Sequence, residues 1–307
     1  MKDKIRAAMF GHAIADAMGV PVEFMSREEL RPEPVTDYCG FGTHQVPAGT
    51  WSDDTSMALA SLDSLAHGVD YDDMMRRFCN WMQNAEYTAT DSVFDIGIAT
   101  RTALNRFLQG TPALRCGCSG EHENGNGSLM RIIPAILYCK YRLAEAPVEE
   151  HISLIHNVSK LTHAHPRSLI GCGIYYFVLM ELLEQPDKKA VEKGLAKAKE
   201  FYSQEPEFVH YLRLIESGFA ALPEQEISSS GYVVVTLEAA VWCLLNTESY
   251  SQCVLKAVNL GRDTDTVAAV AGGLAGALSG MDNIPAAWYS GLLRHEEIEK
   301  LCANFCD

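Results

Sequence analysis

The chain has 307 residues, of which 48% are hydrophobic and 21% are charged, and its formal net charge is −15. These proportions are close to those of ordinary globular proteins, which excludes a disordered or collagen-like chain and leaves enough apolar sequence for a sizeable core. The acidic balance argues against nucleic acids and anionic membranes as partners, because phosphate groups are bound mainly by lysine and arginine.

The cysteines and the apolar stretches indicate where the protein resides. Cys172 and Cys243 lie inside apolar helical patterns, as reduced core cysteines of cytosolic proteins do. No Cys-x-x-Cys pair is present, so we expect no structural zinc. The N-terminal apolar stretch is interrupted by His12 and Asp16, and the uncharged stretch 266–281 is too short and too rich in glycine and alanine to cross a bilayer. We therefore expect a soluble, cytoplasmic protein without membrane contact.

Apolar residues recur with a period near 3.6 along most of the chain, and period-two runs are nearly absent apart from 231–236. The sequence therefore predicts an all-α protein. The expected helices are 3–19, 53–67, 71–84, 91–108, 128–143, 147–163, 166–184, 187–203, 206–221, 236–246, 250–259, 264–280 and 294–305. The segments 20–50 and 109–127 are expected to be loops.

Two of these helices predict how the protein packs. Segment 169–180 is apolar almost all round, which is typical of a helix that others surround. The helix 264–280 carries many glycines and alanines, which let another backbone approach closely. No repeat, linker or low-complexity run interrupts the chain, so we expect one domain over residues 1–307, and we expect a monomer.

Two segments place an excess of oxygen-bearing side chains at the start of a predicted helix. They are 50–58, which reads Thr-Trp-Ser-Asp-Asp-Thr-Ser-Met-Ala, and 261–268, which reads Gly-Arg-Asp-Thr-Asp-Thr-Val-Ala. Helix capping explains one carboxylate and one hydroxyl in each segment, but each has two carboxylates and further hydroxyls. Hard divalent ions such as Mg²⁺ and Mn²⁺ prefer such ligands. The candidate ligands are Ser52, Asp53, Asp54, Asp263, Asp265 and Thr266.

The directions of these side chains favour two ions. Asp53 and Asp54 would diverge by about 100° on a helix, whereas Asp263 and Asp265 share a side where the chain is extended. Divergent and convergent pairs together suit a pair of ions with bridging carboxylates. Such a pair can orient a substrate and activate a water molecule.

Three further segments carry candidate binding or acid-base groups. The glycine-rich stretch 123–131 leads into a helical pattern, so it is either an anion site made of backbone N–H groups or an ordinary turn. Arg131, at its end, could reach the same anion or pair with an aspartate. His163 and His165 could contact a sugar or fix their loop by hydrogen bonds. Glu23 follows a predicted helix, on a loop, where acid-base groups often lie.

Taken together, these segments resemble the motifs of the ADP-ribosylglycohydrolase family, which includes dinitrogenase reductase-activating glycohydrolases and ADP-ribosylarginine and ADP-ribosylserine hydrolases. The motifs are, in order, a Gly-Asp-Ala-x-Gly-like segment with a following Glu, Trp-Thr-Asp-Asp-Thr, Gly-Asn-Gly with Met-Arg, Thr-His, and Gly-Asp-Thr-Asp-Thr. The resemblance runs from Gly11 to Gly276. Ser52 stands where threonine is usual, and Ala15 and Arg262 each replace a glycine, but no departure removes a metal ligand.

The resemblance implies a compact bundle of orthogonal helices. It also implies two Mg²⁺ or Mn²⁺ ions held by the six candidate ligands, with Glu23 in a mobile loop beside them. The residues implied to contact the diphosphate, its neighbouring ribose or the rest of the ligand are Gly125, Asn126, Gly127, Ser128 and His163.

The implied reaction is hydrolysis of the glycosidic bond between ADP-ribose and a protein side chain or small molecule, with Glu23, Asp54 and Asp265 as catalytic carboxylates. Two alternatives stay open: a catalytically silent ADP-ribose-binding or structural homologue, and a hydrolase of another ADP-ribose derivative. The presence of every expected oxygen ligand favours the hydrolase over the silent homologue. The sequence leaves open the linkage (arginine, serine or ester), the target, the physiological metal and the identity of the general base.

Overall fold

The helical periodicity of the sequence is realised almost throughout the chain. The computed structural model describes all residues, 1–307, with fifteen α-helices and no β-strand, so the predicted all-α fold is confirmed. The helices are α1 (Lys2–Gly19), α2 (Arg27–Leu30), α3 (Asp53–Ala66), α4 (Tyr71–Asn84), α5 (Ile98–Leu108), α6 (Ile133–Arg142), α7 (Val148–Lys160), α8 (Pro166–Glu184), α9 (Lys188–Tyr202), α10 (Leu212–Ile215), α11 (Val233–Leu245), α12 (Tyr250–Val258), α13 (Thr264–Ser279), α14 (Ala286–Gly291) and α15 (His295–Cys306). Short 3-10 turns lie at Val20–Val22, Ala113–Arg115, Leu129–Arg131, Pro206–Tyr211, Phe219–Ala221, Glu224–Glu226 and Met281–Asn283.

Two predicted helices are wrong in part. The helix expected over 91–108 begins only at Ile98, because Asp91 and Asp95 adopt left-handed backbone angles (φ 54° and 52°) that an α-helix does not contain. The helix expected over 206–221 is broken into 3-10 turns and the short α10, since Gly218 has a φ of 103°. The short helices α2 and α14 were not predicted, and α2 lies inside the segment 20–50 that was expected to be a loop, where Ser26 caps it.

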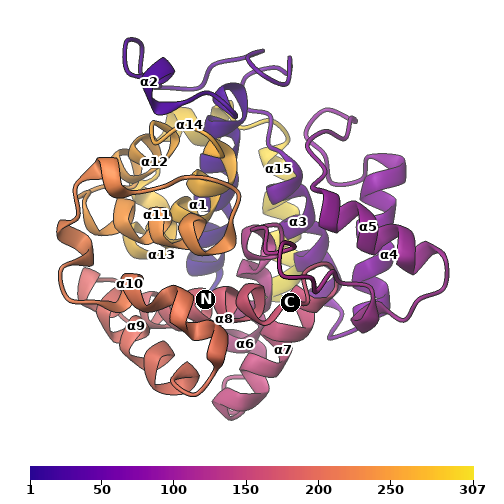
Figure 1. Cartoon of the computed structure of the whole chain (residues 1–307). Coiled ribbons are helices and arrows are strands. Elements are labelled where there is room, and N and C mark those ends of the chain that lie inside the picture. The colour runs from indigo at the N-terminus through magenta and orange to yellow at the C-terminus, as the bar shows by residue number, and fades with distance from the viewer.

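The centre of the fold is the contact between α1 and α13, the most extensive contact between any two helices. In Figure 1, α1 runs through the middle of the molecule, with α11, α12 and α13 on one side and α3 and α15 on the other. The two helices touch backbone to backbone: a Cβ built on Gly11 would lie 2.5 Å from the carbonyl oxygen of Gly272. Small residues at this crossing are therefore required by the approach of the two helices.

The apolar helix expected at the centre is α8. It is long and apolar enough to span a membrane by length and composition alone, but 89% of its most apolar 18-residue stretch is buried inside the fold. It packs against α7, α9, α11 and α13. Ninety buried hydrophobic residues form one continuous cluster around these helices, so no second core is present.

The crossing of α1 and α13 predicts a strong effect of one added methyl group. Gly272→Ala places a Cβ against the backbone of Gly11, which cannot move aside as a side chain can. We expect the two helices to separate and the free energy of unfolding to fall by about 1–3 kcal/mol, the usual cost of overpacking a core. Urea unfolding measures this loss, with Ser279→Ala near the end of the same helix as the control. Equal stability of Gly272→Ala and the wild type would contradict the backbone contact.

Candidate active site

The first acidic segment is held in place by α1. Ser52 caps α3, where its hydroxyl accepts the N–H of Asp54 at 3.2 Å. Asp16, on α1, accepts the N–H of Ser52 at 3.0 Å and both the N–H (3.0 Å) and the hydroxyl (2.6 Å) of Thr55. All these side chains are buried. The early aspartate motif thus positions the start of α3 and with it the two carboxylates of the segment.

The second acidic segment meets the first across the end of α1. A Cβ on Gly19 would lie 2.5 Å from Cα of Asp265, and the hydroxyl of Thr264 donates to the carbonyl oxygen of Gly19 at 2.7 Å. The hydroxyl of Thr266 then donates to Oδ1 of Asp54 at 3.3 Å. The starts of α3 and α13 therefore face each other, although their sequences lie far apart.

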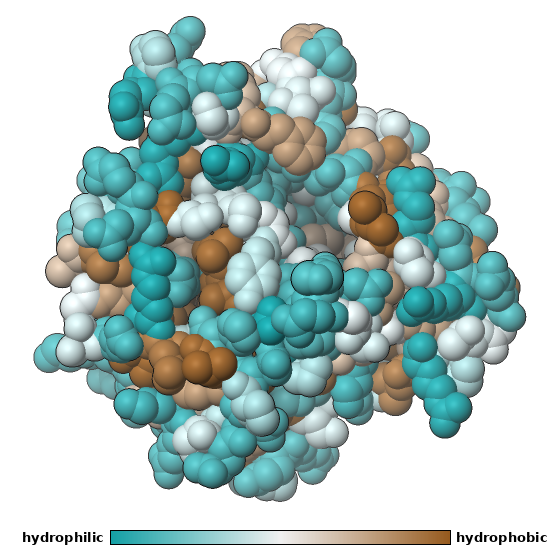
Figure 2. All heavy atoms as spheres, in the orientation of Figure 1, coloured by the Kyte–Doolittle hydropathy of each residue, from teal (hydrophilic) through white to brown (hydrophobic).

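Around this junction lies a cavity of about 600 Å³, a usual size for a ligand pocket. Figure 2, drawn in the orientation of Figure 1, shows a hollow near the middle of this face, between the region of α2 and the start of α5. Of the sequence-predicted residues, the wall contains Glu23, Asp53, Asp54, Gly125, Asn126, Gly127, His163, Asp263 and Thr266. Ser52, Ser128 and Asp265 lie behind this wall, fully or almost fully buried.

The clustered carboxyl groups resist ionisation. Burial, followed by repulsion from neighbouring carboxylates, raises the pKa of Asp53, Asp54 and Asp265 well above the ordinary value. Burial also raises the pKa of Asp16 to about 6, against the hydrogen bonds that it accepts. So many buried acids in contact require either protons or a positive charge among them.

The unsatisfied oxygens at the junction fit a bound cation. Oδ2 of Asp54 and Oδ2 of Asp265 are buried and have no hydrogen-bond partner. Carboxylate oxygens of Glu23, Asp263 and Asp265 lie within 4.8 Å of one another. Buried polar atoms are almost always satisfied, and an oxygen-rich cluster is the ligand set of Mg²⁺ or Mn²⁺. The residues of both acidic segments therefore can hold a divalent cation.

Glu23 lies over this cluster and is only 3% exposed. Its loop is tied down because the N–H of Phe24 donates to the carbonyl oxygen of Arg262 at 2.6 Å and the hydroxyl of Thr43 donates to that of Glu23 at 2.7 Å. Burial raises the pKa of Glu23 to about 7, although the hydrogen bond with His44 opposes this shift. This raised pKa suits Glu23 to accept or donate a proton, as a general acid or base does. Arg262 has a φ of 67°, which accounts for the glycine common at this position in the family motif.

The sequence analysis missed Asp95, which lines the cavity and forms a close group with Glu23 and His44. It was placed inside a helix, whereas it lies in the loop 85–97. Gly97, directly before the true helix start, was a signal that the helix could begin later.

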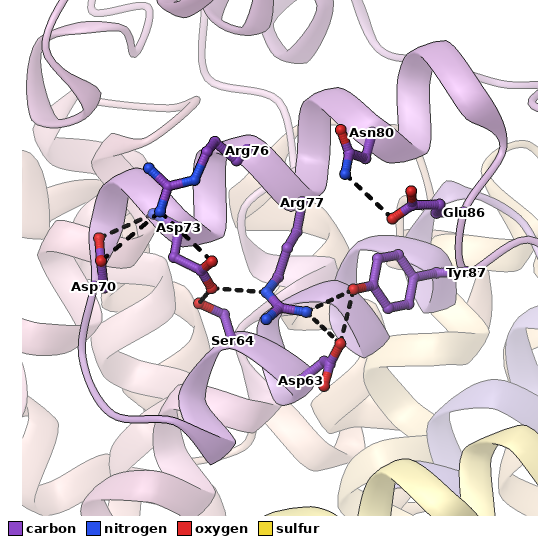
Figure 3. Close-up of polar contacts among 9 residues, drawn as sticks. All are labelled: Asp63, Ser64, Asp70, Asp73, Arg76, Arg77, Asn80, Glu86 and Tyr87. Carbon is purple, nitrogen blue, oxygen red and sulfur yellow. Dashed lines mark hydrogen bonds and ion pairs between the residues drawn. The ribbon is translucent and has the colours of Figure 1, made fainter.

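The loop that carries Asp95 is anchored at its beginning by a polar cluster on α3 and α4. Figure 3 shows Arg77 at its centre: its Nε donates to Asp73 at 2.7 Å and its Nη1 donates to the hydroxyl of Tyr87 at 2.9 Å. The hydroxyl of Tyr87 in turn donates to Asp63 at 2.8 Å. Nε1 of Trp51, next to the first acidic segment, donates to the carbonyl oxygen of Tyr87 at 3.0 Å. These bonds connect the loop to the start of α3.

The glycine-rich segment forms another part of the cavity wall, beside the second acidic segment. Asn126 is held by Asp263, whose Oδ2 accepts its Nδ2 at 2.7 Å. The backbone N–H of Gly127, which lines the cavity, donates no hydrogen bond within the protein, as an anion site requires. Ser128 is fully buried and its hydroxyl points into the core, where it accepts that of Ser159 at 2.8 Å, so the predicted ligand contact of Ser128 is not supported.

The two histidines of the middle segment have different positions. His163 lines the cavity, whereas Nδ1 of His165 accepts the N–H of Arg167 and caps α8. His165 thus has the loop-fixing role that was one of its two alternatives. Arg131 neither faces the cavity nor pairs with an aspartate, so both alternatives for this residue are wrong.

Comparisons with known proteins show which family and which solved structure this chain is similar to. The model of the family described as ADP-ribosylglycohydrolase matches residues 1–307. An ADP-ribosylarginine hydrolase of Serratia proteamaculans is 33% identical over 97% of this chain and 78% of its own length. The ADP-ribosyl-[dinitrogen reductase] glycohydrolase of Rhodospirillum rubrum is 28% identical over 94% of this chain and 90% of its own. A solved structure described as an ADP-ribosylglycohydrolase-related protein complex superposes with a TM-score of 0.83 at 32% identity, over 99% of this chain and 97% of that one.

The raised pKa values predict how pH changes the effect of a divalent cation on stability. A carboxyl group whose pKa is higher in the folded than in the unfolded protein stabilises the fold while it is protonated. This stabilisation is fully present below the unfolded pKa of about 4 and is lost as the pH rises through the folded pKa, up to about 7 here. A bound cation replaces the protons at high pH and competes with them at low pH. The rise in Tm given by MnCl₂ over EDTA should therefore grow between about pH 5 and about pH 7.5.

Differential scanning fluorimetry measures this increment, and taking the difference between MnCl₂ and EDTA cancels titrations elsewhere in the protein. The control is Asp265→Asn, in which the increment should be small at every pH. An increment in the wild type that is constant or falls with pH would contradict the assignment of the cluster to a cation.

Proposed function

This chain belongs to the ADP-ribosylglycohydrolase family, and we propose that it releases ADP-ribose from arginine side chains of modified proteins in a reaction that depends on two Mg²⁺ or Mn²⁺ ions. Membership makes it a hydrolase that acts on ADP-ribose linkages. Arginine is proposed because two relatives, each 33% identical, are named ADP-ribosylarginine hydrolases. The observation that carries the proposal is a single cavity lined both by buried carboxylates and by a glycine-rich segment in which the N–H of Gly127 is unpaired.

The acidic and the glycine-rich parts of the wall suit the two ends of an ADP-ribosyl group. The unpaired N–H group of Gly127 offers a hydrogen bond to the diphosphate, which the acidic part would repel. The acidic part is then left for the distal ribose and its linkage. A positively charged guanidinium leaving group is favoured there by the carboxylates of Asp53, Asp95 and Glu23.

The ions would be held by the six residues of the two acidic segments: Ser52, Asp53, Asp54, Asp263, Asp265 and Thr266. When bound, such ions supply positive charge that orients sugar hydroxyls and makes a water molecule more acidic. The orphaned oxygens of Asp54 and Asp265 support this assignment, because they would otherwise stay unsatisfied in the interior.

Glu23 is proposed as the general base. It accepts a proton from water as the water oxygen bonds to the anomeric carbon. The carbon–nitrogen bond to the guanidinium breaks, its electron pair goes to the nitrogen, and this nitrogen receives the proton that Glu23 took from the water. The products are ADP-ribose and arginine, so all atoms are accounted for. Positive charge that develops on the sugar in the transition state is stabilised by the surrounding carboxylates.

A cytoplasmic location of the enzyme is proposed from its cysteines. All ten cysteines are free, and eight are buried, which agrees with a reducing cytoplasm. The enzyme is proposed to be a monomer that acts on an ADP-ribosylated protein.

The test is release of free ADP-ribose from matched peptides ADP-ribosylated on arginine or serine and from an ADP-ribose ester, with Mg²⁺, Mn²⁺ or EDTA. We expect release from the arginine peptide only, and none in EDTA. Asp265→Ala should abolish release while circular dichroism shows an intact fold. Glu23→Gln should lower kcat by about 10²-fold or more, as loss of a general base does.

Glu28→Gln is the matched control, since Glu28 is an exposed glutamate on α2 that makes no side-chain hydrogen bond. Release from serine or the ester alone would show that the linkage is assigned wrongly. No release from any substrate, with ADP-ribose binding retained in calorimetry, would establish a silent binder. An active Asp265→Ala enzyme would overturn the metal-dependent scheme.

A further inference from the structure

Arg131 is a buried cation without a counter-ion. It is 0% exposed, forms no ion pair, and leaves Nε and Nη1 without hydrogen-bond partners. The guanidinium lies over the ring of Phe78, 4.7 Å from its centroid. Burial lowers its pKa only to about 10, so it stays charged near neutral pH. An uncompensated buried charge is unfavourable for folding, which points to a role of Arg131 through the groups that it contacts.

The contacts of Arg131 lead toward the cavity. Its Nη2 donates to the carbonyl oxygen of Val158 at 3.2 Å and to the hydroxyl oxygen of Thr162 at 2.7 Å. The same hydroxyl lies 2.8 Å from Nδ1 of His163. One unbroken chain of hydrogen bonds thus runs from the buried guanidinium to the imidazole ring that lines the cavity.

The donor and acceptor roles in this series of hydrogen bonds follow from Arg131. A guanidinium only donates, so the oxygen of Thr162 accepts from Arg131. The single hydroxyl hydrogen of Thr162 has one acceptor within reach, Nδ1 of His163. If Nδ1 were protonated, the Thr162 oxygen could accept both hydrogen bonds, but its hydroxyl hydrogen would have no acceptor, so we take Nδ1 as the unprotonated nitrogen. Burial, with repulsion from Arg131, lowers the pKa of His163 to about 3, so the ring is neutral and its one proton is on Nε2.

Nε2 of His163 points at the glycine-rich wall. Cβ atoms built on Gly125 and Gly127 would lie 3.5 and 3.3 Å from it, and it has no hydrogen-bond partner within the protein. The backbone behind the ring is fixed, because the N–H of His163 donates to Ser159 at 2.8 Å and the hydroxyl of Ser159 donates back to its carbonyl oxygen at 3.0 Å. The N–H bond at Nε2 therefore has a defined direction into the cavity.

We propose that Arg131 and Thr162 are positioning residues that hold His163 in the neutral tautomer protonated on Nε2, so that it donates a hydrogen bond to an acceptor oxygen of the ligand beside Gly125 and Gly127. The ligand is ADP-ribose, and to this extent the inference rests on the proposed function. The tautomer itself does not depend on that function. A neutral donor suits a site that must also release the product, since it attracts an anion less strongly than an imidazolium would.

The test uses side-chain ¹⁵N NMR of the ligand-free protein at neutral pH, with the His163 signals assigned by their absence in His163→Asn. The wild type should show the pattern of a ring protonated at Nε2 and unprotonated at Nδ1. Thr162→Val keeps the shape of the side chain and removes the hydroxyl, so the Nδ1–H tautomer should become populated. Thr162→Ser restores the hydroxyl and should restore the wild-type pattern.

Calorimetric titration with ADP-ribose gives the second readout. Thr162→Val should weaken binding by about tenfold, of the order expected when one charge-assisted hydrogen bond is impaired, whereas Thr162→Ser should bind as the wild type does. Thr247→Val is the matched control, since it removes another buried threonine hydroxyl, which donates to the carbonyl oxygen of Cys243 away from the cavity.

A wild-type ring protonated on Nδ1 would overturn the inference without any variant, even if Thr162→Val failed to fold. So would an unchanged tautomer and unchanged affinity in a folded Thr162→Val protein. The wild type could show the expected tautomer, and Thr162→Val could shift it, while neither protein binds ADP-ribose. The proposed function would then fail and the positioning role would stand.

Discussion

The close approach of α1 and α13 is the constraint on which the rest of the structure depends. Gly11 and Gly272 let the two backbones touch, and Gly19 lets the end of α1 meet the start of α13 at Asp265. Because α1 also holds the start of α3 through Asp16, this one contact brings both acidic segments to the same point. A wider separation of the helices would leave two ordinary capped helix ends.

The site combines two kinds of groups that are unfavourable in a protein interior. On one wall, buried carboxylates raise one another's pKa and leave oxygens of Asp54 and Asp265 unsatisfied. Behind another part of the wall, Arg131 is buried and charged without a counter-ion, and it reaches the cavity only through Thr162 and His163. Such groups reduce stability and are common where a protein binds charged ligands. The large hydrophobic core around α8 offsets this loss.

Much of this arrangement could be predicted from the sequence, because helices of this protein have clear periodicity and caps. The limits of α4 and α8 were predicted to the residue, and the two acidic segments were recognised by their excess of oxygen ligands. Asp95 was missed because its loop owes its shape to contacts of Tyr87 with α3 and α4, which periodicity does not reveal. The chain from Arg131 to His163 was missed for the same reason: only the fold brings the guanidinium beside Thr162.

The central claim is that two acidic segments, remote in sequence, form one metal site. The most direct measurement is Mn²⁺ binding followed by electron paramagnetic resonance of the wild type, Asp54→Asn and Asp265→Asn. The account predicts two spin-coupled Mn²⁺ ions in the wild type, as expected for ions about 3.5–4 Å apart, and loss of the coupled pair in either variant. A coupled pair that survives one of the two substitutions would contradict it, since the segments would then not share the site.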